Sequence, residues 1–264
     1  MLDAVIFDYD GVISSTSLRQ ERWFRHYASL HSKEWPFQSF EQFLMFYNEK
    51  CALPGGVQNV YDALDLPCNM NDRAHPVWPA YEQFNQDNPS QPYEGIVETI
   101  RTIWEMGQLG KDPLRNRRLR LGINSSNTWK TIYADLLRSG ALPYFDAFIT
   151  EEVLREYQGG DSEVISKPSP ISLALVLGLL GSEEGCALHV GDTRNDLRAS
   201  QKIMRLNPRR PEKTITVGAC WGYEGRELLE QGTVLPEGRR IHFDHLIDHP
   251  RELVPIVRDY LSSD

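Results

Sequence analysis

Two aspartates, Asp8 and Asp10, stand one residue apart after a short apolar run and are followed by Gly11. Carboxylates in this position can attack an electrophile, exchange protons or bind a cation. Gly11 allows the tight backbone turn that would present both side chains beyond the run. A turn with aspartates that only cap a helix would have a similar sequence. Other residues of the chain must therefore decide whether the pair has a chemical role or only caps a helix.

A second acidic pair, Asp192 and Asp196, follows another apolar run at the expected start of a helix. Asp192 alone could be an ordinary helix N-cap. Four carboxylates at one place would repel one another unless a hard cation neutralised them, and octahedral oxygen ligation suits Mg²⁺. The sequence therefore predicts a Mg²⁺ site formed by Asp8, Asp10, Asp192 and Asp196.

Hydroxyl groups and one ammonium group accompany these carboxylates. Ser125 and Ser126 follow a third apolar run, where Ser125 could be a simple cap or could donate to an anionic oxygen at a helix N-terminus. Lys167 precedes a further expected helix, and an isolated lysine there would usually face solvent. Together these positions describe a carboxylate-rich metal site with one cation and a hydroxyl.

Short apolar runs would position all of these residues. Each is typical of a buried strand, and they are residues 2–7, 119–124, 145–150, 186–190 and 214–219. Apolar residues at helical spacing occur between them, at 128–139, 170–180, 194–204 and 224–231. This alternation predicts a parallel sheet covered by helices, in which ligands bind at the carboxyl ends of the strands.

Residues 15–90 interrupt the alternation. They carry aromatic and aliphatic side chains at helical spacing, with breaks at Pro36, at 54–56 (Pro-Gly-Gly) and at Pro67. We therefore expect a helical domain at 15–90, inserted into a sheet domain made of residues 1–14 and 91–264.

Composition restricts the class of protein. The 264 residues include 28 Lys and Arg against 37 Asp and Glu, a net charge of −9, which argues against nucleic acid or an anionic membrane as a partner. No apolar run approaches the roughly 18 residues of a membrane span, and the first run is too short for a signal peptide. Four cysteines without Cys-X-X-Cys spacing argue against a zinc site or a disulfide framework. We expect a cytoplasmic protein.

The chain resembles the haloacid dehalogenase superfamily of phosphohydrolases. Four segments of the chain are similar to the four motifs of this family and occur in the same order. They are Phe7–Val12, Ile123–Asn127, Ser166–Pro170 and Val190–Asp196. Residues 191–196 and 217–223 resemble the phosphoglycolate phosphatase branch. The resemblance implies an α/β fold in which a Rossmann-like doubly wound parallel sheet carries an inserted α-helical cap domain.

The same resemblance implies a mechanism. Asp8 would attack phosphorus to form an aspartyl phosphate, and Asp10 would protonate the leaving oxygen and then deprotonate the hydrolytic water. Lys167 would be the third catalytic residue, and it would bind phosphoryl oxygens together with Ser125 and Ser126.

The metal would be held in a specific way under this resemblance. Mg²⁺ would be bound by Asp8, the main-chain carbonyl of Asp10 and Asp192, while Asp196 would support the metal or orient Lys167.

The expected activity is hydrolysis of a small phosphorylated metabolite, with phosphoglycolate as one candidate. A phosphosugar mutase of the β-phosphoglucomutase type would use the same aspartates, and a binding module with a relict site is an alternative from another class. The dehalogenase and phosphonate-cleaving branches are disfavoured because neither has an aspartate where Asp10 stands.

Three segments could form the rim of the site. The inserted domain would be a cap that excludes water and reads the leaving group. Residues 54–56 would be its loop directed toward the site, or a plain turn between helices. Residues 107–118 and 206–213 would be solvated loops or an anion-gathering rim. The substrate and the oligomeric state stay open.

Overall fold

A computed structural model describes residues 2–53, 55–70, 72–109, 119–160, 162–182, 185–206 and 214–262. Pro54 and most of the segments 107–118 and 206–213 lie outside the described residues, and so do the expectations that concern them. The chain divides into two compact units. The first comprises residues 1–14 and 92–264, and the second comprises residues 15–91.

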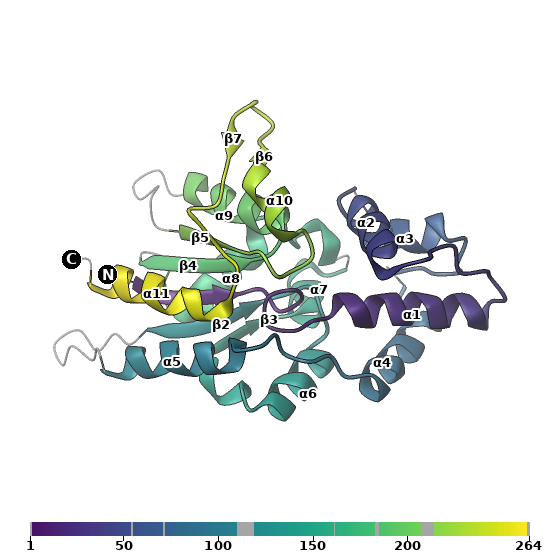
Figure 1. The fold of residues 1–264 in the computed structure, drawn as a ribbon, viewed down its shortest axis with the longest axis horizontal. Coiled ribbons are helices and arrows are strands. Elements are labelled where there is room, and N and C mark those ends of the chain that lie inside the picture. The colour runs from purple at the N-terminus through teal and green to yellow at the C-terminus, as the bar shows by residue number, and fades with distance from the viewer. Residues whose placement is uncertain are drawn as a thin grey trace. The chain divides into compact units, whose positions relative to one another are not determined.

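The first unit is built on a six-stranded parallel sheet with the order β3-β2-β1-β4-β5-β8 (Figure 1). The strands are β1 (Leu2–Phe7), β2 (Arg120–Asn124), β3 (Ala147–Ile149), β4 (Cys186–Gly191), β5 (Thr214–Ala219) and β8 (His245–Ile247). The chain adds β2 and β3 on one side of β1 and then continues with β4 on the other side. Ligands bind at such a reversal in α/β sheets. The predicted doubly wound α/β fold is confirmed.

Helices cover both faces of this sheet. On one face lie α5 (Ile96–Leu109), α6 (Trp129–Ser139) and α11 (Leu253–Ser262). On the other lie α7 (Glu151–Gln158), α8 (Ile171–Leu180) and α9 (Arg194–Leu206). The strands serve both layers because successive side chains point to opposite faces, so that Phe7 packs with the first set and Ile6 with the second. Within the described residues, every helix is too short or too polar to cross a membrane.

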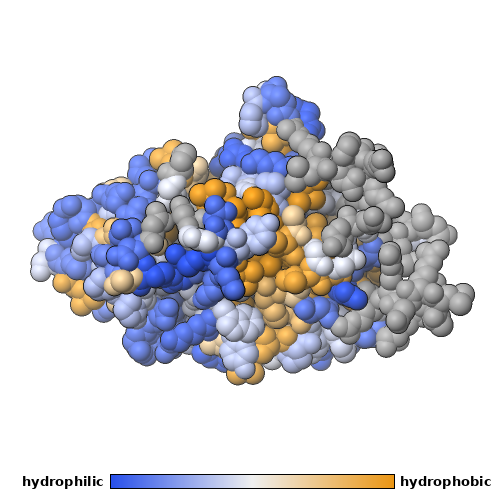
Figure 2. Space-filling model, turned by 180° about the vertical axis from the view of Figure 1, so that it is seen from behind, coloured by the Kyte–Doolittle hydropathy of each residue, from blue (hydrophilic) through white to orange (hydrophobic). Residues whose placement is uncertain are grey.

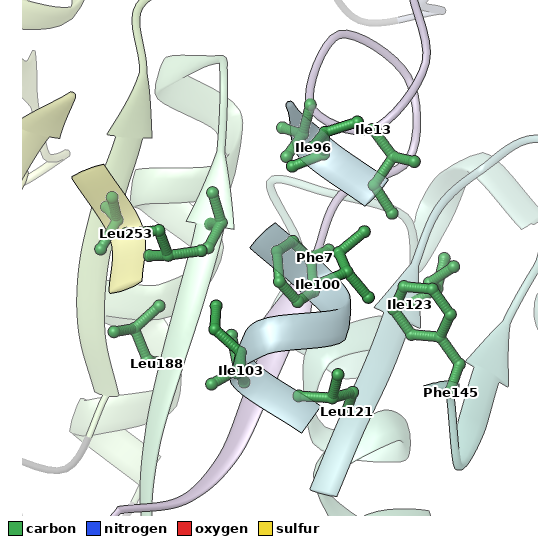
Figure 3. Close-up of a cluster of buried hydrophobic side chains, with 14 of the residues drawn as sticks. Phe7, Ile13, Ile96, Ile100, Ile103, Leu121, Ile123, Phe145, Leu188 and Leu253 are labelled. Carbon is green, nitrogen blue, oxygen red and sulfur yellow. The ribbon is translucent and has the colours of Figure 1, made fainter. Parts of the chain in front are cut away.

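The larger of the two core layers joins strand and helix side chains (Figure 3). On α5, Ile96, Ile100 and Ile103 recur at helical spacing and point at Phe7 and the strands beside it. All of them are at most 1% exposed. Full burial of such a side chain contributes about 1.5–3 kcal/mol to stability, so this layer holds the strand ends firmly in place.

The opposite layer is covered largely by α8, whose sequence ISLALVLGLL contains no charged residue. Figure 2 shows the side of the molecule turned away from the viewer in Figure 1, and apolar surface gathers in the middle of it. Leu179 on α8 is 60% exposed, although Leu173 and Val176 on the same helix are buried. The helix therefore presents apolar atoms both to the core and to the surface.

The end of the first unit differs from the prediction. Besides β8, the chain forms a small antiparallel pair, β6 (Thr233–Val234) with β7 (Arg240–Ile241), after α10 (Gly225–Gln231). These three strands were not predicted. They are two or three residues long, which is too short for the alternation of side chains that identifies a strand in a sequence.

The second unit is helical and has its own core. Its helices are α1 (Ser17–Leu30), α2 (Phe40–Cys51), α3 (Gln58–Ala63) and α4 (Val77–Asp87). The Trp23 ring stacks on Tyr27 with ring centroids 4.9 Å apart, and its indole N–H donates to the Tyr61 hydroxyl at 2.7 Å. Aromatic contacts of this kind, beyond area burial, hold the four helices together.

Candidate active site

The backbone after β1 turns sharply at the carboxyl edge of the sheet. The Asp8 N–H donates to the Val190 carbonyl of β4 at 2.9 Å, which extends the pairing of β1 and β4 by one residue. Gly11 then adopts a φ of +81°. A Cβ atom at Gly11 would lie 1.9 Å from Oδ2 of Asp192. Glycine is thus required here by conformation and by space.

Asp192 is enclosed by main chain. A Cβ atom at Gly222 would lie 2.3 Å from Oδ2 of Asp192, and the Tyr223 N–H donates to that same oxygen at 2.6 Å. The residue is 0% exposed, and its other oxygen, Oδ1, is buried without a hydrogen-bond partner. A buried carboxylate oxygen with no donor is costly, and this is the state expected of a metal ligand.

Lys167 bridges two carboxylates. Its Nζ lies 2.6 Å from Asp8 Oδ2 and 2.8 Å from Asp196 Oδ1, and it donates to the Asn124 carbonyl at 3.2 Å. The second oxygen of Asp196 accepts from the Thr193 hydroxyl at 2.6 Å and from the Thr193 N–H at 3.1 Å. The Lys167 side chain is only 11% exposed, so it does not face solvent.

Asp10 points toward the loop that follows β2. Its Oδ2 accepts from the Ser125 hydroxyl at 3.2 Å, and its Oδ1 accepts from the Asn127 side-chain amide at 3.0 Å. The Asn127 N–H in turn donates to Ser125 Oγ at 3.0 Å. Ser125 is buried and Ser126 is exposed. Asp10 is less buried than Asp8 and is therefore within reach of solvent protons.

Three of these carboxylates form a potential metal site. Asp8, Asp192 and Asp196 each offer one oxygen, and the three oxygens lie within 4.8 Å of one another. Asp10 lies nearby, and among the described residues Lys167 is the ammonium group that contacts this cluster, at Asp8 and Asp196. Hard oxygen ligands, an excess of negative charge and the unsatisfied Oδ1 of Asp192 all fit a divalent cation such as Mg²⁺.

The pKa values reflect this crowding of charge. Burial raises the pKa of Asp8 to about 7, although Lys167 opposes the shift. Burial, with the neighbouring charges of Asp8 and Asp196, raises the pKa of Asp192 well above its ordinary value. Burial alone would also raise the pKa of Asp196, but Lys167, His189 and the Thr193 hydroxyl together outweigh it and hold the value below normal. Lys167 thus compensates Asp196 more than Asp192, whose pKa stays raised despite the Tyr223 N–H and Lys167.

The structure therefore brings Asp8, Asp10, Ser125, Lys167, Asp192 and Asp196 to one edge of the sheet. Sequence reasoning missed the supporting groups, namely the Asn127 side chain, the Thr193 hydroxyl and the Tyr223 N–H. Thr193 could have been suspected from its place between the two aspartates. A main-chain donor such as the Tyr223 N–H leaves no trace in the residue types.

Tyr9 anchors the turn between the two aspartates. Its side chain is 0% exposed, and its hydroxyl donates to Oδ2 of Asp135 on α6 at 2.7 Å. The other oxygen of Asp135 accepts from Arg138 at 2.8 Å. This chain of hydrogen bonds ties the turn of Asp8 and Asp10 to the neighbouring helix.

Comparison with known proteins adds three kinds of likeness. Residues 2–203 match the family model described as haloacid dehalogenase-like hydrolase. The chain is 24% identical over 230 residues to pyrophosphatase PpaX of Bacillus pumilus. The aligned region covers 86% of this chain and 88% of that protein. It is 44% identical over 125 residues to the phosphoglycolate phosphatase of Yersinia pseudotuberculosis, covering 47% of this chain and 42% of that one.

Among solved structures, one described as a predicted phosphoglycolate phosphatase from Haemophilus somnus matches 97% of both chains. The TM-score is 0.66 and the identity is 15%, which shows a shared fold.

Proposed function

The chain belongs to the haloacid dehalogenase-like hydrolase family, and from this membership we propose that it is a Mg²⁺-dependent phosphatase acting on a small phosphorylated metabolite. The observation that carries the proposal is the cluster in which Lys167 contacts Asp8 and Asp196 while Asp8, Asp192 and Asp196 offer converging oxygens. Relatives named phosphoglycolate phosphatase and pyrophosphatase support the same class of chemistry.

Asp8 would be the nucleophile. One of its oxygens accepts from the Tyr9 N–H at 2.7 Å and the other faces Lys167, so the carboxylate is held in a fixed orientation. A carboxylate oxygen of Asp8 would bond to phosphorus as the bond to the leaving oxygen breaks, which gives an aspartyl phosphate and the free alcohol. Water would then attack phosphorus, break the bond to Asp8 and release inorganic phosphate.

Asp10 would move the protons of both steps. It would give a proton to the departing alkoxide oxygen and later take one from the attacking water, which leaves it in its starting state. Its hydrogen bonds to Ser125 and Asn127 hold the carboxyl group in place, and its partial exposure lets the substrate and water reach it.

Ser125, Ser126 and Lys167 would bind the phosphoryl oxygens. Lys167 would supply a charged donor, and the loop before α6 would supply the Ser125 hydroxyl and the Ser126 main-chain N–H, since the N–H groups of Ser125 and Asn127 are already hydrogen-bonded. Mg²⁺, held by Asp8, the Asp10 main-chain carbonyl and Asp192 with Asp196 in support, would neutralise charge on the phosphoryl group.

We assign the role of the cap to residues 15–91. This unit has its own aromatic core, so that its surface residues can vary with the substrate while the sheet unit keeps the common chemistry. Substitutions of exposed residues there should change KM between substrates more than they change kcat.

The test is phosphate release from a panel that includes 2-phosphoglycolate, hexose phosphates and pyrophosphate, with and without Mg²⁺. We expect Mg²⁺-dependent release by the wild type, at least about 10⁴-fold less by Asp8→Asn, and no change in Asp248→Asn, the same substitution at an exposed position. Release that survives in Asp8→Asn would refute the aspartyl-phosphate mechanism. Isomerisation of a hexose phosphate without release would instead support a mutase.

A further inference from the structure

One ion pair joins the loops that follow β4 and β5. Arg194 comes two residues after Asp192 at the start of α9, and Glu224 comes directly before α10. Oε2 of Glu224 accepts from the Arg194 main-chain N–H at 2.9 Å and from its Nε at 3.0 Å. The Glu224 side chain is 12% exposed and that of Arg194 is 32% exposed. The pair is thus partly shielded from water. A charge-assisted hydrogen bond is stronger in such a shielded place than in bulk solvent.

The same two loops meet at Asp192. Tyr223, next to Glu224, donates its N–H to Asp192 Oδ2, and Gly222 packs so closely that a Cβ atom there would overlap the carboxylate. The segment 222–224 therefore contacts the β4 loop twice, once at Asp192 and once at Arg194. The ion pair keeps the loops at the separation that the short hydrogen bond from Tyr223 requires.

This arrangement determines which oxygen of Asp192 is available. Oδ2 is taken by the Tyr223 N–H, and Oδ1 is the buried oxygen without a partner. If the loops separated, the carboxylate could rotate, and neither oxygen would be held in one direction. Ligands that are oriented in advance bind metal more tightly than ligands that must first be ordered.

We propose that Arg194 and Glu224 are positioning residues for Mg²⁺ binding, which act by fixing the hydrogen bond between Tyr223 and Asp192. The inference rests on the proposed function, because it requires the Mg²⁺ site described there. Neither side chain contacts the metal or the substrate in this scheme. Their removal should weaken binding of the metal rather than abolish the chemistry.

The chain offers a matched control. Arg226 and Asp248 form a two-pronged ion pair, with Nε to Oδ1 at 2.9 Å and Nη2 to Oδ2 at 2.8 Å, only two residues beyond Glu224. Their side chains are 42% and 53% exposed. This pair touches no group of the site, and exposed pairs contribute little. Asp248→Asn therefore removes a charge from the same region without affecting Asp192.

The test is calorimetric titration of the metal-free protein with Mg²⁺. We expect Glu224→Ala and Arg194→Gln to bind Mg²⁺ about 10- to 100-fold more weakly than the wild type. Glu224→Gln keeps an acceptor oxygen and should retain part of the affinity, and Asp248→Asn should match the wild type. In phosphate-release assays, the Mg²⁺ concentration for half-activation should rise by the same factor while kcat at saturating Mg²⁺ is recovered.

The possible failures are separable. Wild-type affinity in a folded Glu224→Ala, with circular dichroism unchanged, would overturn this inference and leave the proposed function intact. Equal weakening in Asp248→Asn would also overturn it. Absence of Mg²⁺ binding by the wild type would remove the proposed metal site and this inference with it. Should Glu224→Ala not fold, Glu224→Gln and Arg194→Gln decide, and unchanged affinity in both would contradict us.

Discussion

The aromatic cluster around Trp23 in the helical unit and the carboxyl edge of the sheet both bury polar groups, but the partners of those groups differ. In the helical unit, the Trp23 indole pairs with the Tyr61 hydroxyl, and the Tyr27 hydroxyl donates to the Pro67 carbonyl at 2.8 Å. These groups are neutral and satisfied. At the edge of the sheet, four carboxylates lie together, and the buried Lys167 contacts only Asp8 and Asp196. Burial of paired neutral groups supports a fold, whereas burial of excess charge costs stability and marks a functional site.

After Asp8→Asn, the largest effect should come from Asp10. Asp10→Asn cannot transfer a proton, so kcat for phosphate release should fall about 10²- to 10⁴-fold. The amide can still accept from Ser125, so we expect the unfolding free energy and the Mg²⁺ affinity to stay near those of the wild type. Steady-state kinetics and Mg²⁺ titration measure both. A fall in kcat that merely follows a loss of folded protein would contradict the assignment.

The charge imbalance should also appear as a pH dependence of stability in EDTA. The pKa of Asp8 is raised to about 7 in the folded protein, against about 3.9 in an unfolded chain. The folded state thus holds a proton that the unfolded state has released. Stability from this group is greatest below about pH 4 and is lost as pH rises through 7, by roughly 2–4 kcal/mol.

Denaturant unfolding at several pH values measures this slope. It should be smaller in Asp8→Asn, in which only the raised pKa of Asp192 contributes in the same direction. If the unfolding free energies of the wild type and the variant changed equally between pH 4 and 7, the prediction would be contradicted.

Asp192 offers a sharper form of the comparison, because a substitution there should stabilise the protein while harming its function. Asn at this position keeps an acceptor for the Tyr223 N–H but removes a buried charge. In EDTA at pH 8 we expect Asp192→Asn to raise the unfolding free energy by about 1–3 kcal/mol, because a neutral amide replaces a buried charge whose Oδ1 has no donor. Mg²⁺ binding should be lost in the same variant. A variant that is destabilised without metal would show that the carboxylate is structurally satisfied.

The smallest effect should arise in the helical unit and be confined to stability. Tyr61→Phe leaves the buried Trp23 N–H without its acceptor, which should lower the unfolding free energy by about 1–2 kcal/mol. Mg²⁺ affinity of the folded protein should not change. Thermal unfolding and Mg²⁺ titration of this variant test whether the helical unit contributes to stability alone. An altered Mg²⁺ affinity would contradict that separation of roles.

The sequence predicted the positions where strands of the sheet end, because five of the strands contain apolar runs long enough to recognise. It predicted Asp8, Asp10, Ser125, Asp192 and Asp196 as neighbours for the same reason, since each follows such a run. The short strands β6, β7 and β8 were not visible, because they pair through main-chain groups and show no side-chain pattern.

Other details of the site could not be predicted from residue types. Lys167 was predicted as a site residue through the family resemblance, and the folded chain adds that its ammonium group contacts both Asp8 and Asp196. The orientation of Asp192 depends on the Tyr223 N–H and on the space left by Gly11 and Gly222. The direction of a backbone N–H and the space beside a glycine depend on the fold, so residue types alone do not reveal them.

The pairing of β1 with β4 joins segments that are synthesised far apart in time. Asp8 precedes by more than 180 residues the two aspartates, Asp192 and Asp196, whose oxygens would share a cation with it. During synthesis, Asp8 therefore lacks these partners until residue 196 has been added. A ligand that binds only the folded state stabilises that state by mass action. Mg²⁺ would therefore stabilise the sheet once β1 and β4 have paired, and it would be released whenever these two strands separate.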